Sequence, residues 1–142
     1  MGPEAPITLS KEDACRRQIG EAINALKRGD FDTAITLAGA AEGMFSNRKR
    51  SDIISGLAEY PRAREHFTKP EWIAILNMER DWLKHPTMDL GAEMEFTQMV
   101  AAHMIARAAS KLQNWTPIMK EFKDWFGPII KADLAAMGER RP

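Results

Sequence analysis

TKPEWIAILNMERDWLKHP, the stretch from Thr68 to Pro86, is the part of the chain on which the expected fold and site depend. Thr68 and Glu71 have the spacing of a capping box, and a proline such as Pro70 is tolerated in the first turn of a helix. Pro86 disfavours helical geometry at the residue before it, so the helix should end at His85. The sequence therefore predicts one helix over the whole stretch.

The side chains of this expected helix separate into an apolar arc and a polar face. Helical periodicity of about 100° per residue places these side chains on the arc, which we expect to be core: Trp72, Ile73, Ile75, Leu76, Met78, Trp82 and Leu83. The polar face carries Asn77, Asp81, Lys84 and His85, with Arg80 at its border. This ionisable face is the candidate functional surface.

The composition is that of one globular domain. The chain has 142 residues, of which 44% are hydrophobic and 28% charged. Twenty basic residues balance twenty acidic ones, so a nucleic acid or lipid partner must be held by a local patch. Cys15 is the single cysteine, and neither a signal peptide nor an apolar run near the ~20 residues of a membrane span is present. We therefore expect a cytoplasmic protein with no membrane partner.

The expected fold is all-α, an up-and-down bundle of about five helices. Residues 1–9 are expected to form a disordered N-terminal arm, residues 10–137 a single helical domain, and residues 138–142 a flexible tail. Capping and breaking residues predict a helix over about 11–28, between Ser10 and Gly29, and a second helix from Asp30 or Asp32 to about Asn47. One or two short helices, broken at Pro61, are expected in 51–66, and a long helix over about 91–113. A further helix begins at Pro117 with Thr116 as its cap and is broken at Gly127-Pro128, and residues 129–137 add a turn or two.

Two charged features after the first helix leave alternatives open. Glu42 lies in the middle of the apolar face of the second helix. It is either an acid at a helix border that reaches water or a buried carboxylate that requires a cationic partner. The cluster Arg48-Lys49-Arg50 is either a solvated loop or a phosphate contact.

The polar face of the central helix has residue types that suit metal-free RNA cleavage. Asp81 and His85 are four residues apart, so the carboxylate can orient the imidazole and favour its protonated form. Arg80 can reach the same space, and its guanidinium suits a phosphate. Since the ribose hydroxyl is the nucleophile, the protein need only move protons and hold charge. The structural alternative is that His85 merely caps the helix.

Other kinds of site lack support in the sequence. The three histidines have no metal-ligand spacing, and there is no Gly-rich phosphate loop or nucleophile motif, so we expect no metal and no cofactor. Glu79 lies in the apolar arc and is expected to pair with a cation from another helix. One helix supplies only half of a cleft, and a two-fold axis between two copies would complete it.

Three segments resemble one known family. Residues 80–85, RDWLKH, resemble the R-x(4–6)-H signature of the HEPN superfamily, including the polar residue after the arginine. GDFDTAITLAGAAEGMF, from Gly29 to Phe45, is similar to the matching helix of small bacterial HEPN-like proteins. AAHMIARAASKLQNW, from Ala101 to Trp115, is similar to their closing long helix. The resemblance covers about residues 15–115.

The resemblance implies a helical, usually dimeric protein whose motif helices line a shared cleft. Many members are metal-independent endoribonucleases of toxin or defence systems, which makes Arg80 and His85 the catalytic pair, Asp81 the residue that tunes them and Glu42 a supporting acid. Asn77 and Lys84 are further supporting candidates. RNA is then the substrate, and an antitoxin or nucleotidyltransferase the expected partner. The alternative is a non-catalytic dimer that binds a nucleotide, RNA or a partner protein.

Overall fold

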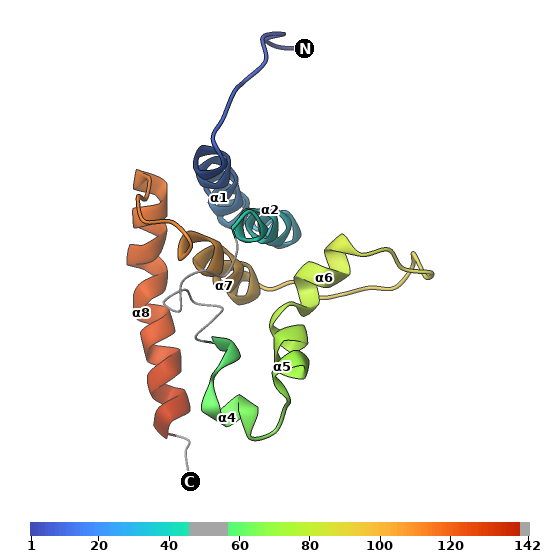
Figure 1. Ribbon diagram of the computed structural model, residues 1–142, viewed down its shortest axis with the longest axis vertical. Helices are drawn as coiled ribbons and strands as arrows, with labels where there is room; N and C mark the ends of the chain where they lie inside the picture. The colour runs from blue at the N-terminus through green and yellow to red at the C-terminus, as the bar shows by residue number, and fades with distance from the viewer. Residues whose placement is uncertain (46–56, 140–142) are drawn as a thin grey trace.

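The computed structural model describes residues 1–45 and 57–139, and within these ranges the chain forms helices and no strand (Figure 1). The helices are α1 (Lys11–Arg28), α2 (Phe31–Gly43), α4 (Pro61–Arg64), α5 (Lys69–Leu76), α6 (Met78–Lys84), α7 (Gln98–Ala109) and α8 (Pro117–Glu139). The all-α expectation is thus confirmed for the described ranges. In them, no helix has the length and apolar character needed to cross a membrane.

The core lies where α1, α2 and α7 pack together, with α8 along one side (Figure 1). Much of it consists of alanine, namely Ala22, Ala25, Ala34, Ala38, Ala41, Ala101, Ala102, Ala108 and Ala109, all buried. Larger side chains such as Ile19, Ile35 and Ile105 fill the space between them. Small side chains allow the helix backbones to approach closely, and this brings the end of α2 against α7.

The ends of α1 agree with the sequence. The Ser10 hydroxyl accepts a hydrogen bond from the Asp13 backbone N–H at 3.1 Å, and Gly29 ends the helix with a φ of 82°. Asp30 precedes α2 as expected, but its carboxylate accepts from the Arg28 side chain at 3.1 Å and does not cap the helix. Asn47, the cluster Arg48-Lys49-Arg50 and residues 51–56 lie outside the described residues. In the rest of the expected helical region 51–66, Pro61 begins the short helix α4.

The central stretch forms two helices, so the prediction of one continuous helix is wrong. The capping box is present, because the Thr68 hydroxyl accepts from the Glu71 N–H at 3.3 Å and the Glu71 carboxylate accepts from the Thr68 N–H at 3.0 Å. That backbone hydrogen bond lowers the pKa of the Glu71 carboxyl. The helix is interrupted at Asn77, whose φ and ψ are −107° and 4°.

Arg107 on α7 explains this interruption. Its guanidinium donates to the Leu76 carbonyl oxygen at 2.8 Å and to Asn77 Oδ1 at 2.7 Å. The Leu76 carbonyl would otherwise accept from Arg80 within a continuous helix. α6 resumes after Asn77 and ends at Lys84, and His85 has an extended ψ of 146°, as Pro86 predicts.

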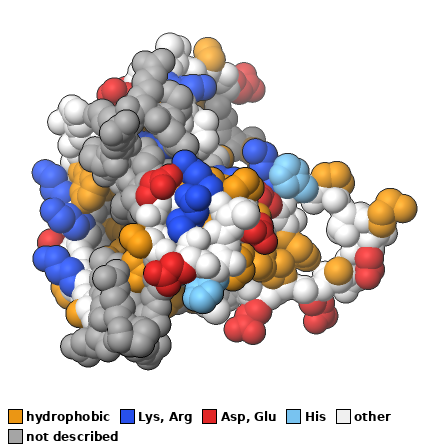
Figure 2. Space-filling model, turned by 60° about the horizontal axis from the view of Figure 1, so that its bottom comes forward, with side chains coloured by type: hydrophobic (Ala, Val, Ile, Leu, Met, Phe, Trp, Pro, Cys, Tyr) orange, Lys and Arg blue, Asp and Glu red, His pale blue; other side chains and the backbone are white. Residues whose placement is uncertain are grey.

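Most of the apolar arc of the central stretch lies outside the core, which corrects a second expectation; of its side chains, Leu83 packs against the core. No residue of α5 or α6 is buried, and Ile75, Met78 and Trp82 are 36%, 49% and 37% exposed. Asn77, from the polar face, is buried instead. α6 therefore turns its polar side towards α2 and leaves much of its apolar side outward. Hydrophobic and acidic side chains continue over the segment after α6, which projects from the body of the molecule (Figure 2).

Two further helix ends differ from expectation. α7 begins at Gln98 and not near residue 91, because the Thr97 hydroxyl caps it by accepting from the Val100 N–H at 3.2 Å. α8 begins at Pro117 as predicted, although the buried Thr116 hydroxyl makes no hydrogen bond with the described chain. The predicted break at 127–128 is wrong, since α8 runs through with Pro128 in its interior.

Candidate functional site

Glu42 is the buried centre of the site. Its side chain is 7% exposed, and both carboxylate oxygens accept from the guanidinium of Arg107, Oε2 from Nε and Oε1 from Nη2, each at 2.8 Å. Arg107 itself is 3% exposed. The structure therefore selects the second alternative for Glu42, a buried carboxylate with a cationic partner.

Arg107 links three parts of the fold through four side-chain hydrogen bonds. Besides the Glu42 carboxylate on α2, it holds Leu76 and Asn77 at the junction of α5 and α6. Sequence reasoning missed this residue, although a signal existed. Arg107 lies three residues after Met104 on the apolar side of α7, so it is a buried cation that matches a buried acid.

Arg80 stands at the edge of this cluster. Its Nη1 donates to Glu42 Oε1 at 3.2 Å, while Nε and Nη2 donate to Asp81 Oδ1 at 3.3 and 3.2 Å. The Arg80 side chain remains 24% exposed. We call Glu42, Asn77, Arg80, Asp81 and Arg107 the charged cluster; its two carboxylates balance its two guanidinium groups.

The structure brings some of the predicted site residues together and leaves others apart. Glu42, Asn77, Arg80 and Asp81 meet in the charged cluster. Lys84 and His85 are exposed and make no side-chain hydrogen bond or ion pair with a described residue. The Asp81 carboxylate contacts Arg80 and not the imidazole. Within the single chain, Asp81 thus fixes the orientation of Arg80 rather than that of His85.

Glu79 and Cys15 do not add to the chemistry of the site. Glu79 is half-buried and forms no ion pair within the described ranges, contrary to expectation. Cys15 is buried, and burial raises the pKa of its thiol to about 11. The thiol therefore stays protonated at neutral pH and is not a nucleophile. No group of three or more metal-binding side chains occurs in the part of the chain that the structure describes.

The chain matches no protein-family model, and neither a curated protein nor a solved structure is significantly similar to it. The geometry of the charged cluster and the chemistry of α6 therefore carry the functional argument. An all-helical architecture does not by itself indicate a function, because function depends on the residues of the site.

Gly39 makes room for the stem of Arg80, and replacing it should disturb the charged cluster. A Cβ at Gly39 would lie 2.8 Å from both Cγ and Cδ of Arg80, too close for an undisturbed contact. Gly20, inside α1, is the matched control, because a Cβ there would meet only Ile118 Cγ2 at 3.8 Å. Alanine is favoured over glycine in a helix interior by about 0.8–1 kcal/mol.

We expect Gly20→Ala to raise the free energy of unfolding by about 0.5–1 kcal/mol, and Gly39→Ala to lower it or leave it unchanged. Urea denaturation followed by circular dichroism measures both variants under the same conditions. Equal stabilisation by the two substitutions would mean that the Arg80 stem does not lie against Gly39.

Proposed function

We propose that this protein is a HEPN-like, metal-independent endoribonuclease that acts as a homodimer, with Arg80 and His85 as the catalytic pair. The observation that carries the proposal is the state of Arg80: two carboxylates orient its guanidinium, and its side chain is 24% exposed. His85 directly follows the same short helix, and its imidazole is free of described partners and open to solvent. A fixed cation and an accessible acid–base group on one helix suit phosphodiester chemistry.

The reaction needs only proton transfer and charge stabilisation. His85 of one subunit accepts the proton of the ribose 2′-hydroxyl as its oxygen attacks the adjacent phosphorus. Arg80 stabilises the charge that develops on the phosphoryl oxygens. The bond from phosphorus to the 5′ oxygen breaks, and a protonated His85 from the second subunit donates a proton to that oxygen. The products are a 2′,3′-cyclic phosphate and a 5′-hydroxyl end.

The remaining predicted site residues support this pair. Asp81 and Glu42 hold the guanidinium of Arg80 in one orientation, while Arg107 holds Glu42. Asn77 anchors the start of α6 through its hydrogen bond with Arg107. The exposed Lys84 adds positive charge beside His85, where an RNA backbone would pass.

A second copy of the chain would complete the cleft, and an exposed apolar surface supports this arrangement. Ile75, Met78 and Trp82 are each more than a third exposed on the outer side of α5 and α6. Apolar side chains of this kind, gathered on one side, favour association. Light scattering coupled to size-exclusion chromatography should give twice the 16.0 kDa mass of one chain.

Cleavage of labelled single-stranded RNA by the purified full-length protein in EDTA tests the proposed activity. His85→Ala should lower the rate at least about a hundredfold, the lower bound for losing a general acid or base. His66→Ala, which removes another exposed histidine, is the matched control and should cleave as the wild type does. Equal cleavage by the His85→Ala variant and the wild type would assign the activity to a contaminant and refute the proposal.

The second candidate is a non-catalytic HEPN-like dimer that binds a nucleotide, RNA or a partner such as an antitoxin or a nucleotidyltransferase. The charge balance of the charged cluster favours it, because Glu42 and Asp81 already neutralise much of Arg80. RNA that is bound but not cut, with binding weakened by Arg80→Gln, would support this function over the enzymatic one.

A further inference from the structure

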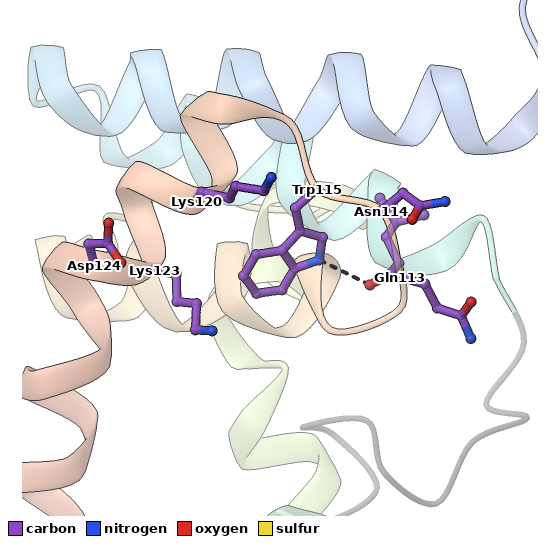
Figure 3. A pocket seen from close by; sticks show the side chains of 7 residues that line it. Gln113, Asn114, Trp115, Lys120, Lys123 and Asp124 are labelled. Atoms are coloured by element: carbon purple, nitrogen blue, oxygen red, sulfur yellow. Dashed lines mark hydrogen bonds between the residues drawn. The ribbon is translucent and has the colours of Figure 1, made fainter.

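A hollow between the start of α8 and the loop that joins α7 to α8 has no part in the proposed function. Its volume is about 700 Å³, within the range of small-molecule sites. Its lining consists of Leu112, Gln113, Asn114, Trp115, Lys120, Lys123 and Asp124. We call it the Trp115 hollow. Figure 3 shows the indole ring with the two α8 lysines on one side and residues 113–114 on the other.

The indole of Trp115 is held in one orientation. Its Nε1–H donates to the carbonyl oxygens of Ala109 and Leu112, each at 3.0 Å, so the polar edge of the ring is satisfied by the protein. The dashed line in Figure 3 marks the bond to Leu112. The Lys123 ammonium lies 5.8 Å from the centre of the ring. The exposed Lys123 side chain covers part of this aromatic surface, and a planar ligand could displace it at little cost.

The lysines of the hollow are available to an anion. Neither Lys120 nor Lys123 forms an ion pair with a described residue, whereas Lys27 and Lys69 are paired with Glu121 and Glu59. Lys120 and Lys123 are three residues apart on α8, so they lie on neighbouring positions of one helix face. Asp124 is the one carboxylate of the lining and opposes anion binding.

We propose that the Trp115 hollow binds a nucleoside phosphate, either a free nucleotide or one unit of a single-stranded RNA. The base stacks on Trp115 and displaces Lys123, and both lysines then hold the phosphate. Aromatic stacking beside lysines is how single strands are bound without sequence preference. An acidic peptide would use the lysines but not the ring face. The site is independent of Arg80 and His85, so its test does not depend on the ribonuclease proposal.

Two probes separate the sources of the ligand, and both use the full-length protein. AMP, titrated by calorimetry, tests a free nucleotide. Fluorescence anisotropy with a labelled 2′-O-methyl oligoadenylate tests binding of a single strand. The oligomer has about eight units, more than the smallest known single-strand binding sites require, and the methyl groups prevent its cleavage. Binding of AMP alone that Lys120→Ala/Lys123→Ala weakens assigns the hollow to a free nucleotide, and binding of the oligomer alone that the same variant weakens assigns it to a strand.

Substitutions inside the hollow give opposite expected effects. Lys120→Ala/Lys123→Ala should weaken binding at least about tenfold. For the oligomer it should reduce the slope of log affinity against log salt by about 0.7, the contribution of the one phosphate that both lysines hold. Asp124→Asn should tighten binding roughly twofold to fivefold, because it removes the opposing charge. Lys131→Ala, another exposed lysine of α8, is the matched control and should bind as the wild type does.

Trp115→Leu should weaken binding roughly fivefold to a hundredfold, while Trp115→Phe keeps a stacking surface and most of the affinity. If Trp115→Leu does not fold, the exposed lysine and aspartate variants still decide the question. The proposal is overturned if neither probe binds at millimolar concentration, or if the double lysine variant binds as tightly as Lys131→Ala. In that case Lys123 only covers the ring of a structural tryptophan.

Discussion

Arg107→Met is expected to lower the free energy of unfolding by about 3–5 kcal/mol, because it leaves the Glu42 carboxylate buried without its main partner. Methionine fills much of the volume of the arginine stem, so the loss reports the missing cation and not a cavity. Arg80 keeps one contact with Glu42 at 3.2 Å, which limits the loss. Urea denaturation at neutral pH, followed by circular dichroism, measures the change.

Arg28→Met is the matched control for this prediction. Arg28 also pairs with a carboxylate, that of Asp30 at 3.1 Å, but both side chains are more than half exposed. An exposed pair contributes about 0–1 kcal/mol, so the control should change stability little. In the double variant Arg107→Met/Glu42→Leu the second substitution should recover part of the loss, since no charge then remains buried. A loss below about 1 kcal/mol for Arg107→Met would mean that the pair is not buried in solution.

The sequence predicted best what depends on local interactions. Ser10 and Thr68 accept the backbone hydrogen bonds that their spacing predicts, and Gly29 ends α1 in the left-handed conformation. These features need only residues within one turn of the helix end. The same holds for Pro86, which ends α6 through the geometry of its neighbour.

What the sequence did not predict depends on contacts between distant helices. The interruption at Asn77 is made by Arg107, thirty residues away, which takes over the carbonyl of Leu76. The orientation of the central stretch also depends on residues that are distant in sequence. The polar side of α6 faces inward because Glu42 and Gly39 on α2 accommodate Arg80. Helical periodicity alone predicts the opposite, that this polar side faces solvent. Of the candidate site, Glu42, Asn77, Arg80 and Asp81 were found, and the residue that joins them was not.

The continuity of α8 through Pro128 leads to the second prediction, which concerns the stability of the fold. A proline inside a helix removes a hydrogen bond and costs about 3 kcal/mol, so another interaction must hold the two halves of α8 in line. Phe126, two residues before the proline, is 2% exposed in the core. Ile129 and Ile130, just after it, also pack against the core. Side chains on both sides of Pro128 are thus anchored to the same surface.

Phe126→Ala should therefore lower the free energy of unfolding by about 3–5 kcal/mol, the range for emptying a buried phenylalanine site. The ring also loses edge contact with His103 at 5.3 Å and contact with Phe122 at 5.4 Å between centroids. Trp125→Ala is the neighbouring control, because that ring is larger but 41% exposed. Urea denaturation measures both, and the control should lose clearly less. If Trp125→Ala lowers the free energy of unfolding as much as Phe126→Ala does, the buried Phe126 ring does not anchor α8. A helix that breaks at Gly127-Pro128 would then fit the result better than a continuous α8.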